Sequence, residues 1–467
     1  MKDISLSKRF VLAAILLCTA CIGGAWAADG TVGACTRKDE FQKKQETVDK
    51  LVVQLTSAKS EAKAKAIAAE IAKKHGTSEI ENLIRYREPQ MKLVFVELLK
   101  AKAWPIRGRA LYGLKMVGDE SVIKNVLDMM NDKEIPVREM AVNTLSHIGN
   151  ADAVKGLEKC KEKEKDPNIL ASIEAALKVL GQEQKPYAEY KGGKKWEEKL
   201  IGPDGAKRVE YAWGWKGEPL FNDYDGKAYD LPEATTFCYP ISSYKTDLFA
   251  SYPRNSFAAG GNHAAEDCAW FREGCSYYAI ADGVVRMVQG AGGDWGFLVL
   301  IEHKLPGGEY IVSLYGHSAW DLLVKPGDMV KAGQKIATQG LSCSVENGGY
   351  GSHIHFGLGD GPYRRPKKCS KGDTYKYKDA EGKEVSGKIV RFGYSTTETD
   401  GYSFPKMTAV VETPDGKTQE VVMEDEPLQD QIAWNQPYVE KCKGWLNPEK
   451  FLPERVEPKK PDGKKRK

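Results

Sequence analysis

The chain has 467 residues, enough for two to four domains, and its 41% hydrophobic and 29% charged residues are typical of globular protein, which excludes a disordered or fibrous chain. The formal net charge is +4, and residues 457–467 alone contribute +4, because they hold six Lys/Arg and two acidic residues. The rest is close to neutral, which argues against nucleic acid as a partner. The basic tail, 454–467, is interpreted as a solvated end, with contact to an anionic envelope surface as the alternative.

The first stretch, 1–27, has the features of a secretory signal peptide. Basic residues precede an apolar run at 10–21, and an A-x-A cleavage site ends at Ala27. A lipid anchor on Cys21 is the alternative, although Cys18 stands where an aliphatic residue is expected in such signals. No later stretch is long and apolar enough to span a bilayer. We therefore expect an exported protein of the periplasm or cell envelope, or an extracellular one.

The cysteine content also bears on the expectation of an exported protein. The sequence has ten cysteines, and eight remain once the two in the signal are removed. An even number in an exported protein predicts disulfides. Proximity in the chain favours Cys268 with Cys275 and Cys343 with Cys369, although sequence alone does not fix the connectivity. A zinc–thiolate site is disfavoured because the sequence contains no CxxC pair.

Residues 36–183 are predicted to form a helical domain. The segments 43–55 and 60–74 are rich in Ala, Lys, Glu and Leu, with apolar residues at three- and four-residue spacing. A sequence repeat follows, in which one pattern recurs at an almost constant interval: Ile106-Arg107, Ala110, Leu114, Gly118; Val137-Arg138, Ala141, Leu145, Gly149; Ile173, Leu177, Gly181. Such a period predicts paired helices that bury their apolar stripes on their neighbours.

Over 91–181 these repeats resemble short HEAT-like repeats. A solenoid of this kind presents a surface to a protein partner, or acts as a spacer or stabilising cap. We hypothesise that the helical domain docks the chain on a partner or restrains its activity until needed. His75 and His147 have no ligand-like neighbours in the sequence, so both are interpreted as structural.

A β-rich region follows the helical domain. Residues 184–245 lack a clear period and are interpreted as a linker with lead-in strands. Beyond them, short β-rich runs bounded by Gly or Pro occur at 281–288, 297–301, 310–315 and 335–338. These runs predict an antiparallel sheet in a domain made of 246–366 and 437–453. The expected fold class is therefore multidomain, with an all-α helical-repeat domain followed by a mainly antiparallel β domain.

An insertion in this domain, 367–436, is interpreted as a separate β subdomain. Strands are expected at 388–394, 407–413 and 420–424, with a hairpin turn at 414–416. This insertion would either narrow the choice of substrate or act as a lid.

Four histidines and one aspartate of the β domain form a candidate metal constellation. His353 and His355 are two positions apart in a run that has the pattern of a strand, so both side chains project to one face. His263 and Asp267 lie four positions apart upstream, and His317 ends a β-run. Imidazole nitrogens and carboxylate oxygens are good zinc ligands, and a catalytic zinc typically takes three protein ligands and leaves a position for water.

In this order and with the intervening sequence, these sites resemble the lysostaphin-like (LytM-type) zinc metalloendopeptidases. The resemblance covers 261–358 and a closing stretch, and it rests on His263-x-x-x-Asp267, ADGVV at 281–285, YGH at 315–317, V-x-x-GQ-x-I at 330–336 with Gly340, SHIHF at 352–356, and W-x-NP-x-x-FL at 445–452. By this resemblance the chain binds one zinc ion per catalytic domain.

The resemblance also implies a role for each residue of the constellation. His263, Asp267 and His355 correspond to the zinc ligands, and His353 and His317 to the catalytic histidines. His353 is assigned as the general base, and His317 as the group that orients the water or stabilises the oxyanion, although these two roles are interchangeable. His303, at the end of a predicted strand, is interpreted as structural.

The function implied by the resemblance is that of an exported zinc metalloendopeptidase, which hydrolyses peptide bonds in the stem or cross-link peptides of bacterial peptidoglycan. One alternative is a metal-free scaffold that activates other cell-wall hydrolases, but this chain keeps all three ligand types and both additional histidines. Another is a secreted protease that acts on foreign protein or on a competitor's cell wall.

Overall fold

The computed structural model describes residues 32–76, 79–192, 206–212, 219–225, 227–244, 265–268, 272–291, 295–363, 372–399, 402–422 and 445–456. The predicted signal peptide, His263 and the tail beyond 456 lie outside these residues. Within the described ranges, no helix is both long and apolar enough to cross a membrane.

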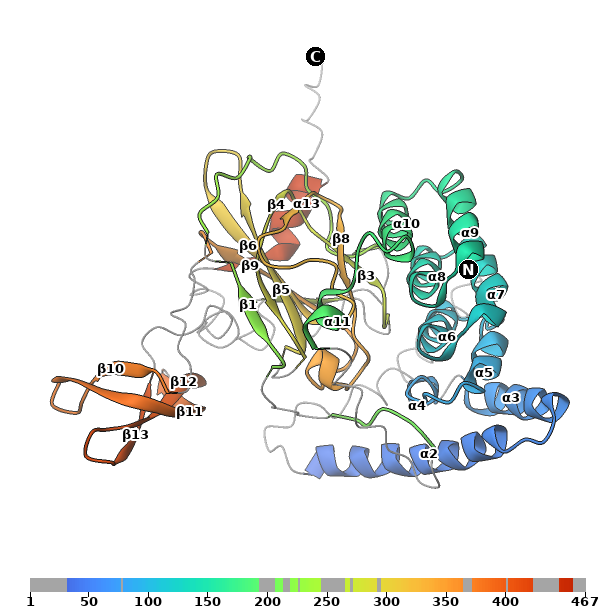
Figure 1. The fold of residues 1–467 in the computed structure, drawn as a ribbon, viewed down its shortest axis with the longest axis horizontal. Helices are drawn as coiled ribbons and strands as arrows, with labels where there is room; N and C mark the ends of the chain where they lie inside the picture. The colour runs from blue at the N-terminus through green and yellow to red at the C-terminus, as the bar shows by residue number, and fades with distance from the viewer. Residues whose placement is uncertain are drawn as a thin grey trace, which may run out of the picture.

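An all-α domain forms the N-terminal part, on the right of Figure 1. Its helices are α2 (Val32–Thr56), α3 (Glu61–His75), α4 (Ile80–Leu83), α5 (Met91–Leu98), α6 (Trp104–Val117), α7 (Ile123–Asp128), α8 (Ile135–Ile148), α9 (Ala151–Lys161), α10 (Pro167–Leu180) and α11 (Tyr187–Gly192). The three copies of the sequence repeat fall on α6, α8 and α10, and each copy ends at the glycine that follows its helix.

The repeated residues explain where these three helices begin and end. Each of α6, α8 and α10 has a proline in its first turn, where the missing N–H costs nothing. Helix α6 stops at Gly118, where a Cβ would lie 2.4 Å from the carbonyl oxygen of Leu114. Helix α8 stops at Gly149 in the same way, with a contact of 2.3 Å to Leu145 O. No larger residue fits either position without rearrangement.

The β domain is built on an eight-stranded antiparallel sheet with the order β1-β4-β5-β6-β9-β14, in which β2 also pairs with β9 and β7 with β4. Its strands are β1 (Asn222–Tyr224), β2 (Ala265–Cys268), β4 (Gly283–Gln289), β5 (Phe297–Lys304), β6 (Tyr310–Ser318), β7 (Met329–Val330), β9 (Ile354–Asp360) and β14 (Trp445–Leu446). A separate pair joins β3 (Ser276–Tyr278) to β8 (Lys335–Thr338). Helix α13 (Pro448–Val456) follows β14.

The predicted insertion forms its own four-stranded sheet, which projects away from the rest of the protein in Figure 1. Its strands are β10 (Thr374–Lys378), β11 (Glu384–Thr399), β12 (Tyr402–Glu412) and β13 (Thr418–Val422). A small core that includes Tyr375, Ile389 and Val411 supports it. The turn between β12 and β13 contains Gly416 at φ +78°, a conformation that glycine adopts without strain.

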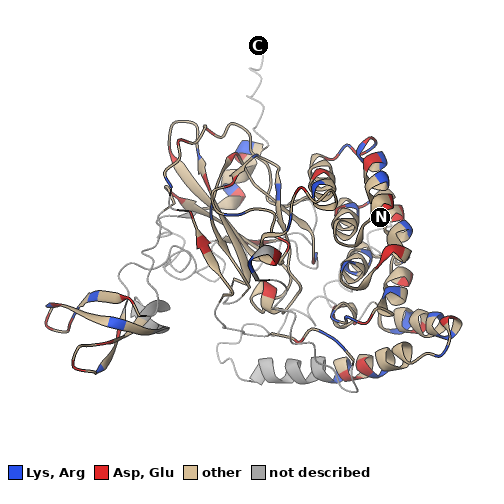
Figure 2. Cartoon of the chain, in the orientation of Figure 1, with Lys and Arg blue, Asp and Glu red and all other residues tan. Residues whose placement is uncertain are grey.

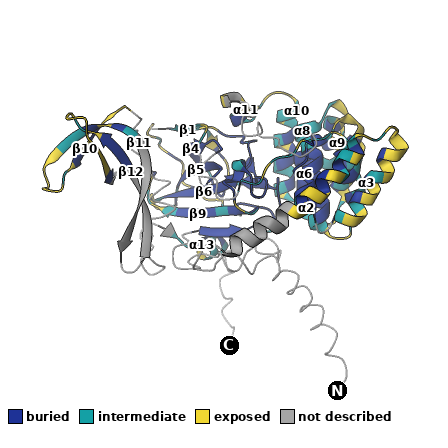
Figure 3. Ribbon diagram, turned by 90° about the horizontal axis from the view of Figure 1, so that it is seen from below, coloured by how far each residue is buried: buried dark blue, intermediate teal, exposed yellow. Residues whose placement is uncertain are grey.

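Helices α6, α8 and α10, the inner helices, lie between the β domain and the outer helices α5, α7 and α9 (Figures 1 and 3). The inner helices are therefore buried from two sides. Three polar side chains at three-residue spacing on α6 reach the β domain. Arg109 pairs with Glu273 at 3.0 Å, Tyr112 OH donates to Glu346 at 3.1 Å, and Lys115 pairs with Asp321 at 2.6 Å. The inner face of the repeats is therefore covered by the chain's own β domain.

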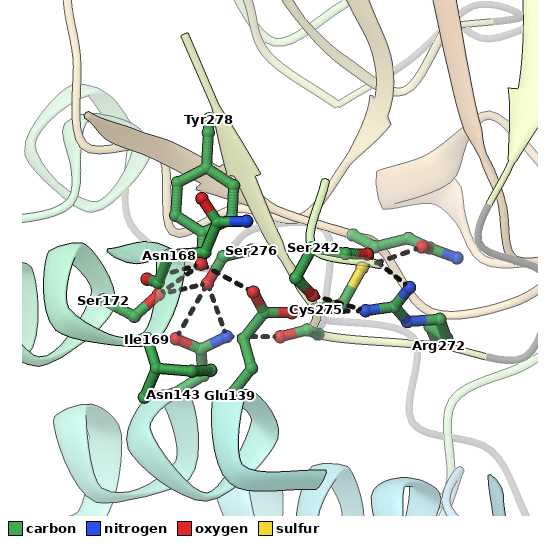
Figure 4. Close-up of polar contacts among 12 residues, drawn as sticks. Glu139, Asn143, Asn168, Ile169, Ser172, Ser242, Arg272, Cys275, Ser276 and Tyr278 are labelled. Carbon is green, nitrogen blue, oxygen red and sulfur yellow. Dashed lines mark hydrogen bonds and ion pairs between the residues drawn. The ribbon is translucent and has the colours of Figure 1, made fainter. Parts of the chain in front are cut away.

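Helices α8 and α10 continue this polar contact (Figure 4). Asn143 Nδ2 donates to Gly274 O at 2.7 Å, and Tyr278 OH donates to the Glu139 carboxylate at 2.6 Å. Burial raises the pKa of Glu139, and the nearby Arg272 guanidinium opposes that rise. On the outer helices, by contrast, acidic and basic residues are intermingled (Figure 2). We conclude that the helical and β domains are joined by specific buried polar groups.

The predicted disulfides are not formed among the described cysteines. Cys268 and Cys275 are not bonded to each other, and Cys275 Sγ instead donates to Gln339 Oε1 at 3.2 Å. Cys343 is a buried thiol, and its predicted partner Cys369 lies outside the described residues. Proximity in sequence is a poor guide here, because a disulfide needs Cβ atoms that face each other at about 3.8 Å.

Candidate active site

Three neighbouring strands bring the predicted site residues together. In the β2–β9 ladder, Asp267 lies directly opposite His355. In the β6–β9 ladder, Gly316 lies opposite the same histidine, which places His317 at the end of β6 beside it. His353 directly precedes β9, so the strand begins later than the sequence suggests. Residues from distant parts of the sequence therefore meet around the start of β9.

The side chains converge on one point. Asp267 Oδ1 lies 3.1 Å from His355 Nδ1 and 3.4 Å from His353 Nε2. The ring centroids of His317 and His353 are 4.4 Å apart. The potential ligand atoms of His317, His353 and His355 all lie within 4.8 Å of one another. Of the five residues selected from the sequence, these four form one cluster, and His263 lies outside the described residues.

Two of the imidazoles are oriented by backbone carbonyls. His317 Nδ1 is 2.8 Å from Asn347 O, and His353 Nδ1 is 2.6 Å from Gly351 O. A carbonyl oxygen only accepts hydrogen bonds, so each Nδ1 carries the proton and each Nε2 is left toward the cluster. Burial, together with His353 and His355, holds the pKa of His317 well below its usual value. The neutral His317 ring thus presents a lone pair on Nε2.

The backbone at His317 is held in an uncommon conformation. Its φ is +57°, in the left-handed region that non-glycine residues rarely adopt. Hydrogen bonds fix this turn on both sides, because His317 N donates to Trp295 O at 3.0 Å and Gly340 N donates to His317 O at 2.9 Å. The preceding Gly316 leaves no room for a side chain, since a Cβ would lie 2.8 Å from Trp295 Cε3. The chain therefore tolerates local strain in order to direct the His317 ring.

Two aromatic residues flank the histidines, and nothing in the sequence indicated them. The Trp295 ring stacks on His317 at 6.1 Å and contacts His355 edge-on at 4.9 Å. The Tyr350 ring lies 5.0 Å from His317 and is 42% exposed. Asn347, which orients His317, was also missed, because it acts through its backbone carbonyl and any residue type supplies one.

His303 lies apart from this cluster. It is fully buried on β5, with Nδ1 2.9 Å from Asp282 O and Nε2 2.7 Å from Ser313 Oγ. Burial lowers its pKa to about 4. Both ring nitrogens are engaged by protein atoms, so this histidine has none to offer a ligand.

The clustered donors fit a tetrahedral metal ion. With metal–ligand bonds of about 2.0–2.1 Å, adjacent ligand atoms in a tetrahedron are about 3.3 Å apart. The distance between Asp267 Oδ1 and His355 Nδ1, 3.1 Å, is close to that value. Two ligand sets would share His355. The set expected from the sequence adds Asp267 and His263, which lies outside the described residues, and the set that the geometry groups together adds His317 and His353.

Comparison with known proteins agrees with this arrangement. Residues 262–366 match the model of peptidase family M23, and residues 93–178 match the model of HEAT repeats. The chain therefore carries an M23 peptidase domain, a hydrolase domain, preceded by a HEAT-repeat domain. Both resemblances expected from the sequence are confirmed, as is the fold class of helical repeats followed by antiparallel sheets.

A solved structure from Ruminococcus gnavus, described as a proposed glycyl-glycine endopeptidase lytM, is also similar to this chain. It is 12% identical, the match covers 68% of this chain and 91% of that chain, and the TM-score is 0.17. A TM-score this low supports no structural argument. The assignment of the peptidase and HEAT-repeat domains therefore rests on the family models. No curated protein matches the chain.

Proposed function

We propose that this protein is an exported zinc metalloendopeptidase that hydrolyses peptide bonds in the stem or cross-link peptides of bacterial peptidoglycan. The observation that carries the proposal is the convergence of Asp267, His317, His353 and His355 within the segment that matches peptidase family M23. Export rests on the signal-peptide pattern at 1–27.

His263, Asp267 and His355 would hold the zinc ion. When bound, zinc would polarise the scissile carbonyl and acidify a water molecule. This division of roles leaves His317 and His353 for proton transfer, and both have Nδ1 anchored to a backbone carbonyl. His353 Nε2 would accept the proton of the attacking water and return it to the leaving amine. His317 would orient the water or stabilise the oxyanion, and the exchange of these roles is the alternative.

The aromatic side chains of Trp295 and Tyr350 form a partly apolar wall beside the histidines. Trp295 is nearly buried against two of the histidines, whereas Tyr350 is partly exposed beside His317. A partly apolar wall next to the histidines would limit water around a bound peptide. A protein partner of the helical repeats would have to use their outer helices, because the inner ones already contact the β domain.

Digestion of purified peptidoglycan, followed by mass spectrometry of the products, tests the function. The zinc-loaded wild type should release peptide fragments, and His353→Ala should be slower by at least about 100-fold. His75→Ala, at the end of α3 and away from the site, is the matched control and should behave as wild type.

Two results would support the rival functions. A wild type that binds no zinc and leaves peptidoglycan intact would indicate a scaffold that activates other hydrolases. Cleavage of unrelated proteins or of foreign cell walls in preference to the host's own peptidoglycan would indicate a secreted protease that acts on foreign protein or on a competitor's cell wall.

A further inference from the structure

The loop between β8 and β9, residues 340–352, carries the carbonyl group that orients His317. A short 3₁₀ turn at Val345–Asn347 presents Asn347 O to His317 Nδ1 at 2.8 Å. The side chain of Asn347 also donates to Tyr350 O at 2.8 Å, which places the Tyr350 ring beside the same histidine. The position of this 340–352 loop therefore sets the orientation of the His317 ring.

The helical domain holds the 340–352 loop directly. Tyr112 OH, on α6, donates to Glu346 Oε1 at 3.1 Å, and the same oxygen accepts from Leu341 N at 2.7 Å. Arg85, fully buried after α4, donates to the carbonyl oxygen of Ser342. Burial raises the pKa of Tyr112 well above its usual value, so its hydroxyl stays a donor. Two residues from the helical domain thus contact the loop, and one of them binds the neighbour of Asn347 in sequence.

The same loop also packs closely against the β domain. Gly296, at φ +61°, lies so close that a Cβ would come within 2.0 Å of Glu346 O. The loop also contains Cys343 at φ +52°, a left-handed conformation that costs free energy in a residue with a side chain. A strained loop of this kind keeps one shape only when its surroundings impose it. Here those surroundings include helix α6.

We propose that the helical repeats are part of the catalytic unit and position His317 through Tyr112, Glu346 and Asn347. Tyr112 and Glu346 are positioning residues, because they act on His317 only through the loop that carries Asn347. The repeats hold the 340–352 loop of their own chain in place, and the loop fixes the ring orientation and tautomer of His317. This inference rests on the proposed function for its kinetic consequence, but the orientation of His317 is measurable without any activity.

Tyr112→Phe removes one hydroxyl and keeps the ring that packs on Gly274. In the full chain we expect kcat for peptide cleavage to fall about 10-fold with KM unchanged, as for loss of a group that orients a site histidine. Tyr278→Phe is the matched control, because it removes an equally buried hydroxyl from the same domain interface without touching the loop. It should leave kcat at the wild-type value.

A second pair of variants tests Glu346. Glu346→Gln keeps an oxygen that accepts from Tyr112 and Leu341, so it should retain most activity. Glu346→Ala removes the acceptor and should lower kcat as Tyr112→Phe does. The double variant Tyr112→Phe/Glu346→Ala should lose no more than Glu346→Ala alone, because both changes break one connection.

Nuclear magnetic resonance of the full chain labelled with ¹⁵N-histidine reads out the orientation directly. In wild type, His317 should be in the Nδ1–H tautomer with a slowly exchanging Nδ1 proton, and in Tyr112→Phe that proton should exchange faster and the tautomers should mix. An unchanged His317 signal in a folded Tyr112→Phe variant would overturn the proposal. If the signal changes but wild type cleaves no peptide, the positioning stands and the proposed function fails.

Discussion

Asp267 and His355 face each other across the antiparallel β2–β9 ladder, with Asp267 Oδ1 3.1 Å from His355 Nδ1. Sheet register alone makes this pairing, because side chains of directly opposed residues lie on the same face. A carboxylate and an imidazole at that separation satisfy two adjacent corners of a metal tetrahedron. The potential ligand atoms of His317 and His353 lie within 4.8 Å of that of His355, so a second ligand set shares this histidine.

Metal content of single variants separates the two ligand sets. We expect His355→Ala and Asp267→Ala to fall from about one zinc per chain to well below one, because each loses a ligand. His353→Ala and His317→Ala should keep their zinc while losing peptide cleavage. Elemental analysis of the purified proteins measures this. Loss of zinc from both His353→Ala and His317→Ala would favour the three-histidine set instead.

Gly316→Ala tests the close packing under the site. The new Cβ would lie 2.8 Å from Trp295 Cε3 and 3.4 Å from His355 Cβ. We expect the free energy of unfolding to fall by about 1–3 kcal/mol, as for overpacked cores, and peptide cleavage to fall sharply because the Trp295 ring must move.

Gly108→Ala is the control for that substitution. Its nearest neighbour would be Met140 Cγ at 4.0 Å, and it lies inside helix α6. Here alanine should raise stability by about 0.5–1 kcal/mol through its higher helix propensity. Denaturant unfolding compares the two variants. Equal effects of the two changes would argue against the close contact with Trp295.

Asp321 should make stability depend on acid pH. Burial tends to raise its pKa, but the Lys115 and Lys335 ammonium groups outweigh that effect and lower it to about 2. A carboxylate with a depressed pKa stabilises the folded state above its ordinary pKa of about 3.9 and loses that contribution as pH falls toward 2. The contribution is about 2 kcal/mol at neutral pH.

Asp321→Asn should therefore be less stable than wild type at pH 7, by about 3–5 kcal/mol because it also leaves the buried Lys115 without a counter-charge. The difference should shrink as the pH of a urea titration is lowered from 4 to 2. Asp415→Asn is the control. Hydrogen bonds from Thr413 and Lys417 lower the pKa of Asp415 to about 2 as well, but solvent screens this exposed side chain, so stability should change little. A difference that stays constant over this pH range would contradict the assignment.

Deletion of residues 28–185 is the natural test of a detachable docking domain, and the structure predicts that it will fail to give a stable protein. It would expose Glu273 and Tyr278, which are fully buried against helices α6 and α8. Uncompensated polar groups at a former interface are costly and promote aggregation. Yield in the soluble fraction and the midpoint of thermal unfolding measure this. A soluble fragment that melts like the full chain would show that the domains are independent.

Most of the correct predictions came from local sequence patterns. Each copy of the repeat marks one inner helix, because Pro at the start and Gly at the end restrict where a helix can run. The spacing of His353 and His355 placed both at one site, since alternate residues of an extended chain share a face. The prediction of a Cys268–Cys275 disulfide was wrong, because closeness along the chain says nothing about the facing of two Cβ atoms.

By itself, then, the sequence determined which elements form and which residue types could bind a metal, because those properties depend on neighbours within a few positions. Only the tertiary structure decided that the repeats turn their inner face to the β domain and that Tyr112 reaches Glu346, 234 positions away. Long-range contacts of this kind follow from how whole surfaces pack, and a buried hydroxyl needs an acceptor wherever the fold supplies one. The orientation of His317 depends on that packing, through a backbone carbonyl that no sequence motif marks.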